Sequence, residues 1–417
     1  MPTDASPAVT RAVDHERARP AFHVGYEQFH PDVSLNFQLN RWVQWLGDDA
    51  VLADMQTVAP RIKDYADWKR EFLHLAGHAL AEGRILPAAF YFRSAEFFMV
   101  SEDIDRGPAR AQFLELVRRG YAIKNTEQYA VPYAGSTLPA YRFTPAQPKG
   151  TIVVFGGFDS YIEEFFPIAF FLVASGYDVV LFDGPGQGGA LNDNRLPMTH
   201  VWEQPVKVVL DYFGLADVTL FGISLGGGLA IRAAAFEPRI GRVIADDILF
   251  DFRECLFRQV NPVLKAILKL LLAARAEALV NMLVRRAALR KPVVAWGIGQ
   301  GMHVLAVTSP YQFFEAAKRY TTRHVSARVT ADVLLLAGSE DHYVPLRQFY
   351  QQASALKRVC SLTGRIFTRQ EHAQNHCQIG NIGLALHVIL HWLDGLDQRT
   401  RTPGHAGKEQ RYEAQPT

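Results

Sequence analysis

The sequence predicts an α/β fold in which a mostly parallel sheet is covered by helices on both faces. Short apolar runs rich in β-branched residues alternate with apolar helical segments, as is typical of strands buried on both sides. With 417 residues, 49% of them hydrophobic, the chain is long enough for one large domain of this kind and an additional domain. The predicted strands are residues 138–143, 151–155, 178–182, 218–221, 242–245, 333–337 and 364–367.

Helical patterns fill most of the intervals between these strands, for example over residues 165–174. Only the turn-forming residues 145–150 separate the first two strands, so we expect these two to pair with each other. The interval between residues 247 and 333 is far longer than the dozen or so residues that a helical crossover needs. We therefore predict a helical insertion over about residues 252–325. It is interpreted as a lid over an active site, with a membrane-surface helix as the alternative because the segment carries several lysines and arginines.

The remaining segments differ in composition. Residues 21–130 are rich in aromatic side chains at helical spacing, which predicts a helical N-terminal domain with a capping or dimerisation role. Residues 131–397 are expected to form the α/β domain with its insertion. The polar and charged ends, residues 1–20 and 398–417, are expected to be disordered.

Charge, hydropathy and cysteine content restrict the class of protein. The net charge is +2 and no basic stripe is interleaved with aromatic residues, so no nucleic-acid partner is expected. No secretory signal and no apolar run of membrane-spanning length is evident, and the three cysteines lack metal or redox spacing. We therefore expect a cytoplasmic protein without membrane contact, in a reducing compartment.

The most informative motif is Gly222-Ile223-Ser224-Leu225-Gly226, which follows a β-branched strand and precedes an alanine-rich helix. This is the sequence context of a nucleophile elbow, a sharp turn that presents a serine hydroxyl at a helix N-terminus. Glycine two residues before and after the serine leaves room for the turn. Ser224 is therefore predicted to be a nucleophile, with a structural turn as the alternative.

A serine nucleophile needs a base, and the base needs an orienting carboxylate, in the chain order serine, acid, histidine for this type of sheet. Asp341, directly after a predicted strand, is the expected acid in preference to Glu340; its alternative role is a helix N-cap. His376 is the expected base in preference to His372. The two histidines do not form a His-Glu-x-x-His zinc motif, because Glu371 precedes both, so neither a metal nor a cofactor is expected.

The loop after residues 151–155 contains paired glycines and is predicted to form an oxyanion hole. The backbone amides of Phe158 and Leu225 are the expected donors. Gly157 and Asp159, in the same loop, are candidates for contact with the substrate or for support of the residues that make it.

Four longer strings contain or extend these motifs and follow one another along the chain: Gly156-Gly157-Phe158-Asp159-Ser160-Tyr161-Ile162-Glu163-Glu164, Phe182-Asp183-Gly184-Pro185-Gly186-Gln187-Gly188, Gly222-Ile223-Ser224-Leu225-Gly226-Gly227 and His376-Cys377-Gln378-Ile379-Gly380-Asn381. Through them the chain resembles one branch of the α/β hydrolases. That branch includes 2,6-dihydroxypseudooxynicotine hydrolase and the fungal polyketide-shortening hydrolases of melanin synthesis, and fermentation-respiration switch esterases are more distant. The resemblance extends from about residue 90 to residue 393.

The resemblance implies an α/β-hydrolase fold, a homodimer, and a helical N-terminal domain that helps to wall the active site. It implies a triad of Ser224, Asp341 and His376 that hydrolyses carbon–carbon bonds beside a ketone. Some members carry a glutamate soon after the strand that follows the nucleophile helix; Glu254 is the nearest match, with a solvated helix residue as the alternative. The chain departs from the branch at Asp246-Asp247-Ile248, where a Trp-Gly-Ala type of strand end is expected, and we expect this wall to touch the substrate.

Together these features predict a serine hydrolase acting on a small-molecule acyl or ketone substrate, aromatic or polyketide-like, by cleavage of an ester or of a carbon–carbon bond beside a carbonyl. An acyltransferase or thioesterase with the same triad is the first alternative, because an apolar lid that excludes water would favour transfer to another nucleophile. A non-catalytic binding protein on a hydrolase scaffold is the second.

Overall fold

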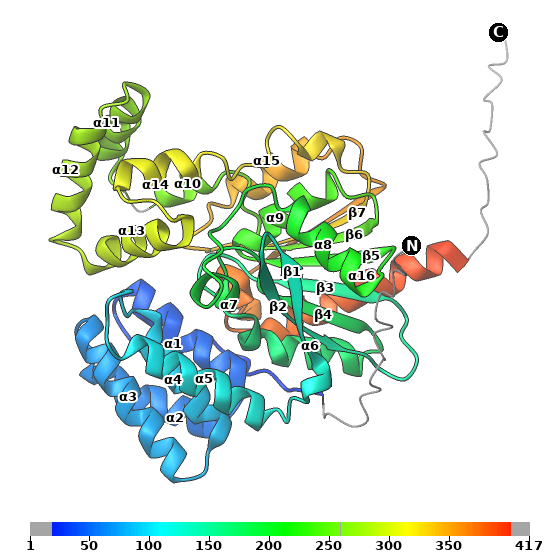
Figure 1. The fold of residues 1–417 in the computed structure, drawn as a ribbon, viewed down its shortest axis with the longest axis horizontal. Helices are drawn as coiled ribbons and strands as arrows, with labels where there is room; N and C mark the ends of the chain where they lie inside the picture. Colours follow the sequence, from blue (N-terminus) through cyan, green and yellow to red (C-terminus); the bar gives the residue numbers. More distant parts are fainter. Residues whose placement is uncertain (1–18, 259, 402–417) are drawn as a thin grey trace, which may run out of the picture.

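A computed structural model describes residues 19–258 and 260–401 of the chain. An eight-stranded sheet forms the centre of the molecule, with the strand order β1-β2-β4-β3-β5-β6-β7-β8 (Figure 1). The pairs β1–β2 and β2–β4 are antiparallel, and the pairs from β4 to β8 are parallel. The strands are β1 (Gln128–Tyr133), β2 (Ser136–Phe143), β3 (Thr151–Phe155), β4 (Asp178–Phe182), β5 (Val218–Ile223), β6 (Ile240–Asp246), β7 (Asp332–Gly338) and β8 (Ser361–Phe367).

The predicted α/β class is confirmed, and each predicted strand is present, but the predicted pairing of the first two is wrong. β4 lies between β2 and β3 and is hydrogen-bonded to both. The crossover from β3 through a helix brings β4 alongside β3 in parallel, and this leaves the far edge of β4 for β2. A buried ion pair also joins β2 to β4, with 2.8 Å between Nη2 of Arg142 and Oδ2 of Asp178. The sequence analysis also missed β1, so the sheet begins before residue 131.

Helices cover both faces of the sheet. The predicted helical segment 165–174 corresponds to α6. The last helix continues through Arg401 and so extends into the segment that was expected to be a disordered tail; residues 1–18 and 402–417 lie outside the described part of the chain. The helices are α6 (Phe166–Ala174), α7 (Gly188–Asn192), α8 (Glu203–Phe213), α9 (Leu225–Ala234), α15 (Arg347–Ala355) and α16 (Ile382–Arg401), with short 3₁₀ turns at Ala59–Arg61, Asn125–Glu127, Ile162–Phe165, Ser326–Arg328, Arg369–Glu371 and His376–Gln378.

A separate group of helices precedes the sheet (Figure 1). Their aromatic residues are core residues: Trp42, Trp68 and Phe90 are fully buried. One apolar cluster joins these helices to one face of the sheet, where it includes Ile152 and Val179. The helices are α1 (Val33–Leu46), α2 (Asp49–Val58), α3 (Tyr65–Ala81), α4 (Ile85–Phe97) and α5 (Arg106–Gly120).

Further helices are inserted between β6 and β7, where the long interval in the sequence lies. They contain a small core of their own, which includes Leu268, Val280 and Phe314. Trp296 connects them to the N-terminal group, because its Nε1–H donates to the carbonyl of Phe97 at 3.0 Å and the two rings stack. In Figure 1 both groups lie on the same side of the molecule. The inserted helices are α10 (Phe252–Leu256), α11 (Pro262–Ala273), α12 (Glu277–Ala288), α13 (Pro292–Leu305) and α14 (Pro310–Ala317).

Within the described ranges, no single helix is long and apolar enough to cross a membrane; one pair of segments, Arg369–Gln378 and Ile382–Gln398, passes that test only when combined and is bent by 82°.

Candidate active site

Ser224 occupies the sharp turn between β5 and α9. Its φ of 61° and ψ of −123° place it outside the usual regions for a residue with a side chain. The flanking glycines make the turn possible: a Cβ on Gly222 would lie 2.0 Å from the carbonyl oxygen of Gly226, and a Cβ on Gly226 would lie 2.6 Å from that of Gly156. The predicted elbow is therefore present, and it presents the serine hydroxyl at the carboxyl edge of the sheet.

The three residues of the predicted triad lie in hydrogen-bond contact. Nε2 of His376 is 2.8 Å from Oγ of Ser224, and Nδ1 of His376 is 2.6 Å from Oδ2 of Asp341. The other oxygen of Asp341 accepts from the backbone amides of Tyr343 at 2.7 Å and Val344 at 2.9 Å. These amides fix the carboxylate, which in turn orients the imidazole with Nε2 toward the serine.

Burial and charge act in opposite directions on the pKa values of Asp341 and His376. Burial alone would raise the pKa of Asp341, but the neighbouring His376 and the amide of Val344 hold that pKa below its usual value. Burial alone would lower the pKa of His376, but the Asp341 carboxylate and other neighbours raise it well above its usual value. The site is therefore built to stabilise an imidazolium beside a carboxylate, which is the charge state that forms when the histidine accepts the serine proton.

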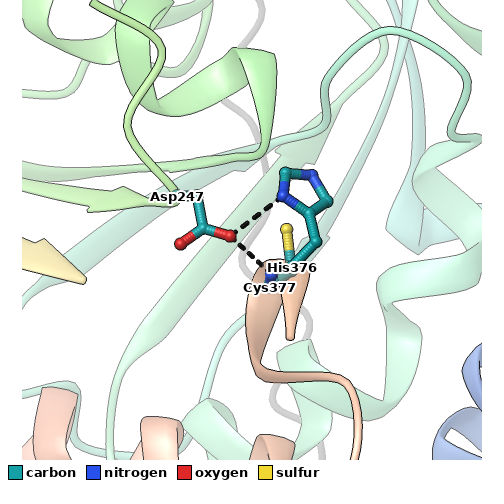
Figure 2. Close-up of side chains that lie close together, drawn as sticks. All are labelled: Asp247, His376 and Cys377. Atoms are coloured by element: carbon teal, nitrogen blue, oxygen red, sulfur yellow. Dashed lines mark hydrogen bonds and ion pairs between the residues drawn. The ribbon is translucent and has the colours of Figure 1, made fainter. Parts of the chain in front are cut away.

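Asp247 is a second carboxylate at the same imidazole. Its Oδ2 lies 3.0 Å from Nδ1 of His376 and accepts from the backbone amide of Cys377 at 2.6 Å (Figure 2). The expectation that the 246–248 segment touches the substrate is not met, because none of its residues is among those that line the cavity described below. The sequence did hold a usable signal: an acid directly after a parallel strand lies at the same sheet edge as Ser224 and Asp341.

The ligand-type atoms of Asp247, His376 and Cys377 all lie within 4.8 Å of one another, a spacing that would suit a metal ion. However, Oδ2 of Asp247 is already hydrogen-bonded to both neighbours (Figure 2). Burial also raises the pKa of the Cys377 thiol to about 12, whereas a metal ion binds the thiolate. The chemistry of these groups fits the histidine network better than a metal centre.

The loop after β3 is held in a defined conformation beside the elbow. The side-chain amide of Gln187 donates to the carbonyls of Gly156 at 2.6 Å and Gly157 at 3.0 Å. A Cβ on Gly157 would lie 2.9 Å from the amide nitrogen of Leu225, so only glycine allows this approach. Phe158 and Leu225, the predicted oxyanion donors, both line the cavity at Ser224.

Asp159 links this loop to the N-terminal helices. It pairs with Arg41 of α1 at 3.3 Å, and its backbone carbonyl accepts from Arg93 of α4 at 2.6 Å. Both guanidinium groups also bind the fully buried carboxylate of Glu164, at 2.5 Å for Arg41 and 2.8 Å for Arg93. Sequence reasoning missed this network because its partners are far apart in the chain and no local pattern joins them.

Glu254 lies away from the triad. Its carboxylate is paired with Lys265 at 3.2 Å, Lys269 at 2.5 Å and Arg347 at 2.8 Å. Burial favours its neutral form, but the two lysines lower its pKa to about 2. It is not among the residues of the described chain that line the cavity, so this structure places it in an ion-pair cluster that connects α10, α11 and α15.

A cavity of about 570 Å³ opens onto Ser224. Its walls come from α1, the loop after β3, the elbow and the inserted helices, and apolar side chains such as Phe37, Trp45 and Leu283 predominate. Arg41 and Arg258 also reach it. The cavity can therefore hold a large, mainly apolar molecule with a carbonyl group at the serine.

Comparison with known proteins identifies the family. A family model described as serine aminopeptidase S33 (Hydrolase_4) matches residues 146–365, more than half of the 417 residues. The chain belongs to this family of α/β hydrolases. The match spans β3 through most of β8, and so includes the elbow and Asp341.

Fungal hydrolases are among the similar proteins. Hydrolase LUC6 from Fusarium sp is 27% identical over 412 residues, covering 88% of this chain and 97% of that protein. The 20-hydroxy-prefusarin hydrolase FUS2 from Gibberella moniliformis is 32% identical over 243 residues, covering 49% of this chain and 58% of that protein. The crystal structure of 2,6-dihydroxy-pseudo-oxynicotine hydrolase has a TM-score of 0.55 at 20% identity and covers 82% of this chain and 91% of that one. These findings confirm the predicted resemblance and the α/β-hydrolase fold.

Proposed function

We propose that the protein is a serine hydrolase that cleaves a bond beside a carbonyl group of a large, mainly apolar substrate, with Ser224 as nucleophile, His376 as base and Asp341 as the orienting acid. The observation that carries this proposal is the continuous series of contacts from Asp341 through His376 to Ser224, at 2.6 and 2.8 Å, with Ser224 and His376 lining the cavity.

The geometry supports the following course of reaction. Oγ of Ser224 attacks the carbonyl carbon while Nε2 of His376 takes the hydroxyl proton, and Asp341 stabilises the resulting imidazolium. The amides of Phe158 and Leu225 donate to the oxyanion. When the tetrahedral intermediate collapses, the bond to the leaving group breaks and His376 returns the proton to it. Water, deprotonated by His376, then releases the acid product from Ser224.

Several observations favour a polyketide-like ketone or ester as the substrate. The cavity is large and apolar, and a relative of this chain is named for 20-hydroxy-prefusarin. For a β-diketone the leaving group is an enolate carbon, which must receive a proton. Glu254 is ionised and tied to three cations, so we assign that proton transfer to His376.

Acyl transfer with the same triad is the second candidate function. It is favoured by one observation: α1 and the inserted helices cover the cavity at Ser224, and such cover restricts the access of water to an acyl-enzyme. Analysis of products formed with and without a competing alcohol or amine distinguishes hydrolysis from transfer. The expected homodimer and cytoplasmic location stay predictions.

The proposal is tested by trapping the acyl-enzyme. The protein is incubated with a fluorophosphonate and, separately, with a panel of β-diketones and esters, and the modified peptide is identified by mass spectrometry. We expect the label on Ser224, and a loss of about a thousandfold or more in activity for Ser224→Ala. Ser339→Ala is the matched control, because Ser339 lies at the same sheet edge but outside the cavity wall. Turnover by Ser224→Ala at the unmodified rate contradicts the proposal.

A further inference from the structure

Three neighbouring strands deliver functional groups to one imidazole. Ser224 follows β5, Asp247 follows β6 and Asp341 follows β7, and these strands run parallel with Ile223 beside Asp246 and Asp246 beside Leu336. The carboxyl ends of parallel strands meet at one edge. Acids after two different strands can therefore reach the same side of His376.

Both carboxylates face the same nitrogen. Nδ1 of His376 lies 2.6 Å from Oδ2 of Asp341 and 3.0 Å from Oδ2 of Asp247, and both acid side chains are almost completely buried. Since Nδ1 carries a single hydrogen, the two oxygens must share one donor. Asp247 is also anchored independently, by the backbone amide of Cys377 at 2.6 Å and more weakly by the side-chain amide of Gln378 at 3.5 Å.

We propose that Asp247 is a second positioning residue for His376, sharing the Nδ1 hydrogen with Asp341 and able to hold the imidazole when Asp341 is replaced. This inference rests on the proposed roles of Ser224, His376 and Asp341. It adds a residue that those roles do not require.

Several buried titratable groups surround the imidazole of His376. Burial, together with the charge of Asp341, raises the pKa of Asp247 to about 6. Burial and the neighbouring Asp247 hold the pKa of Asp246 well above its usual value. Four further groups near the imidazole are uncharged at neutral pH: burial lowers the pKa of His342 to about 4 and raises those of Tyr343, Cys255 and Cys377 to about 12. Arg41, Arg258 and Asp159 also line the cavity.

Above pH 6 Asp247 and Asp341 are the two carboxylates that contact Nδ1 of His376 in their ionised form. An ionised Asp247 stabilises the imidazolium and raises the pKa of His376. Replacing Asp247 by asparagine removes that charge with little change of shape. We expect the pKa of His376 to fall by about one unit or more in Asp247→Asn, and the acidic limb of the pH–rate profile to move to lower pH by the same amount.

The experiment compares Asp247→Asn, Asp341→Asn, the double variant and Asp246→Asn. The last is the matched control: Asp246 is a buried neighbour, and the carboxylates paired with Nδ1 of His376 are those of Asp247 and Asp341. Two quantities are measured over a pH range of about two units on either side of neutrality. One is the rate of fluorophosphonate labelling of Ser224, and the other is the pKa of His376 from NMR of protein with ¹⁵N-labelled histidine.

In a triad with a single carboxylate, replacing that acid lowers the reaction rate by about 10⁴-fold. Here we expect the labelling rate of Asp341→Asn to fall by only about 10- to 100-fold, because Asp247 still accepts from Nδ1. We expect the labelling rate of the double variant to fall by about 10⁴-fold. The inference is overturned if Asp341→Asn shows the full loss by itself while Asp247→Asn leaves the pKa of His376 unchanged. If the unmodified protein does not react at Ser224, the proposed function fails, and the NMR titration still decides whether Asp247 acts on His376.

Discussion

Replacing Glu164 by glutamine tests whether the N-terminal helices are bound to the active-site loop by charge. The Glu164 carboxylate is fully buried, binds Arg41 and Arg93, and accepts from the backbone amide of Tyr161 at 3.0 Å. Arg93 keeps Glu96 as a partner at 2.5 Å, and Arg41 keeps the more exposed Asp159. Glutamine preserves the shape but leaves two buried guanidinium groups with one negative charge fewer.

Breaking a buried ion pair on one side costs about 3–5 kcal/mol. Since each arginine retains another acid, we expect the lower end of this range, about 3 kcal/mol in the free energy of unfolding measured in urea. The matched control is Glu340→Gln, which removes an ion pair with Arg369 whose side chains are 42% and 74% exposed. That change should cost less than about 1 kcal/mol.

Fluorophosphonate labelling adds a functional readout of the same variant. Glu164 fixes Tyr161, and Arg93 holds the carbonyl of Asp159, so a loosened network should displace the oxyanion loop and slow the labelling of Ser224. Equal unfolding free energies for Glu164→Gln and Glu340→Gln would refute this account of the network.

Two further changes test the elbow and the ion-pair cluster of the inserted helices. Gly222→Ala should reduce labelling of Ser224 by about 100-fold or more, because the new Cβ would collide with the carbonyl of Gly226; Gly77→Ala, where nothing lies within 4 Å, is the neutral control. Glu254→Gln should leave the labelling rate near that of the unmodified protein, and a large loss would show that Glu254 takes part in the reaction. Because the pKa of Glu254 is lowered, its ion pairs stabilise the fold above about pH 4.3, and this contribution is lost as the pH falls toward about 2. Acid unfolding of Glu254→Gln and of the unmodified protein, measured side by side, should show this difference.

The order of the three proposed triad residues along the chain could be predicted, because the loops that follow parallel strands all lie at one edge of the sheet. Ser224 and Asp341 follow β5 and β7, which are buried and are visible in the sequence as apolar runs. His376 comes after β8, an edge strand that is largely exposed. The pairing of β2 with β4 could not be predicted in the same way. A turn signal reports only that the chain changes direction, and not that a later strand enters between the two.

The contacts that join separate helical groups were also invisible in the sequence. Arg41 and Glu164 lie 123 positions apart, and Trp296 and Phe97 lie 199 apart. Neither pair has a periodic pattern, because the pairing depends on how complete elements pack. The N-terminal helices could therefore be predicted as helices, and the family resemblance implied that they wall the active site. Their attachment by charge to the loop after β3 could not be predicted.

The two acids at His376 show why chain order alone cannot assign the orienting carboxylate. Asp247 and Asp341 end neighbouring strands, so either could serve by topology. Their local environments separate them. Asp341 receives two backbone amides and makes the shorter contact with Nδ1, and its pKa is held low. Asp247 receives one backbone amide, and burial together with the charge of Asp341 raises its pKa to about 6. Asp341 is therefore ionised throughout the neutral range, and Asp247 adds its charge only as the pH rises through about 6. The strength of the base should accordingly depend on pH through Asp247, even though Asp341 holds the imidazole at every pH in that range.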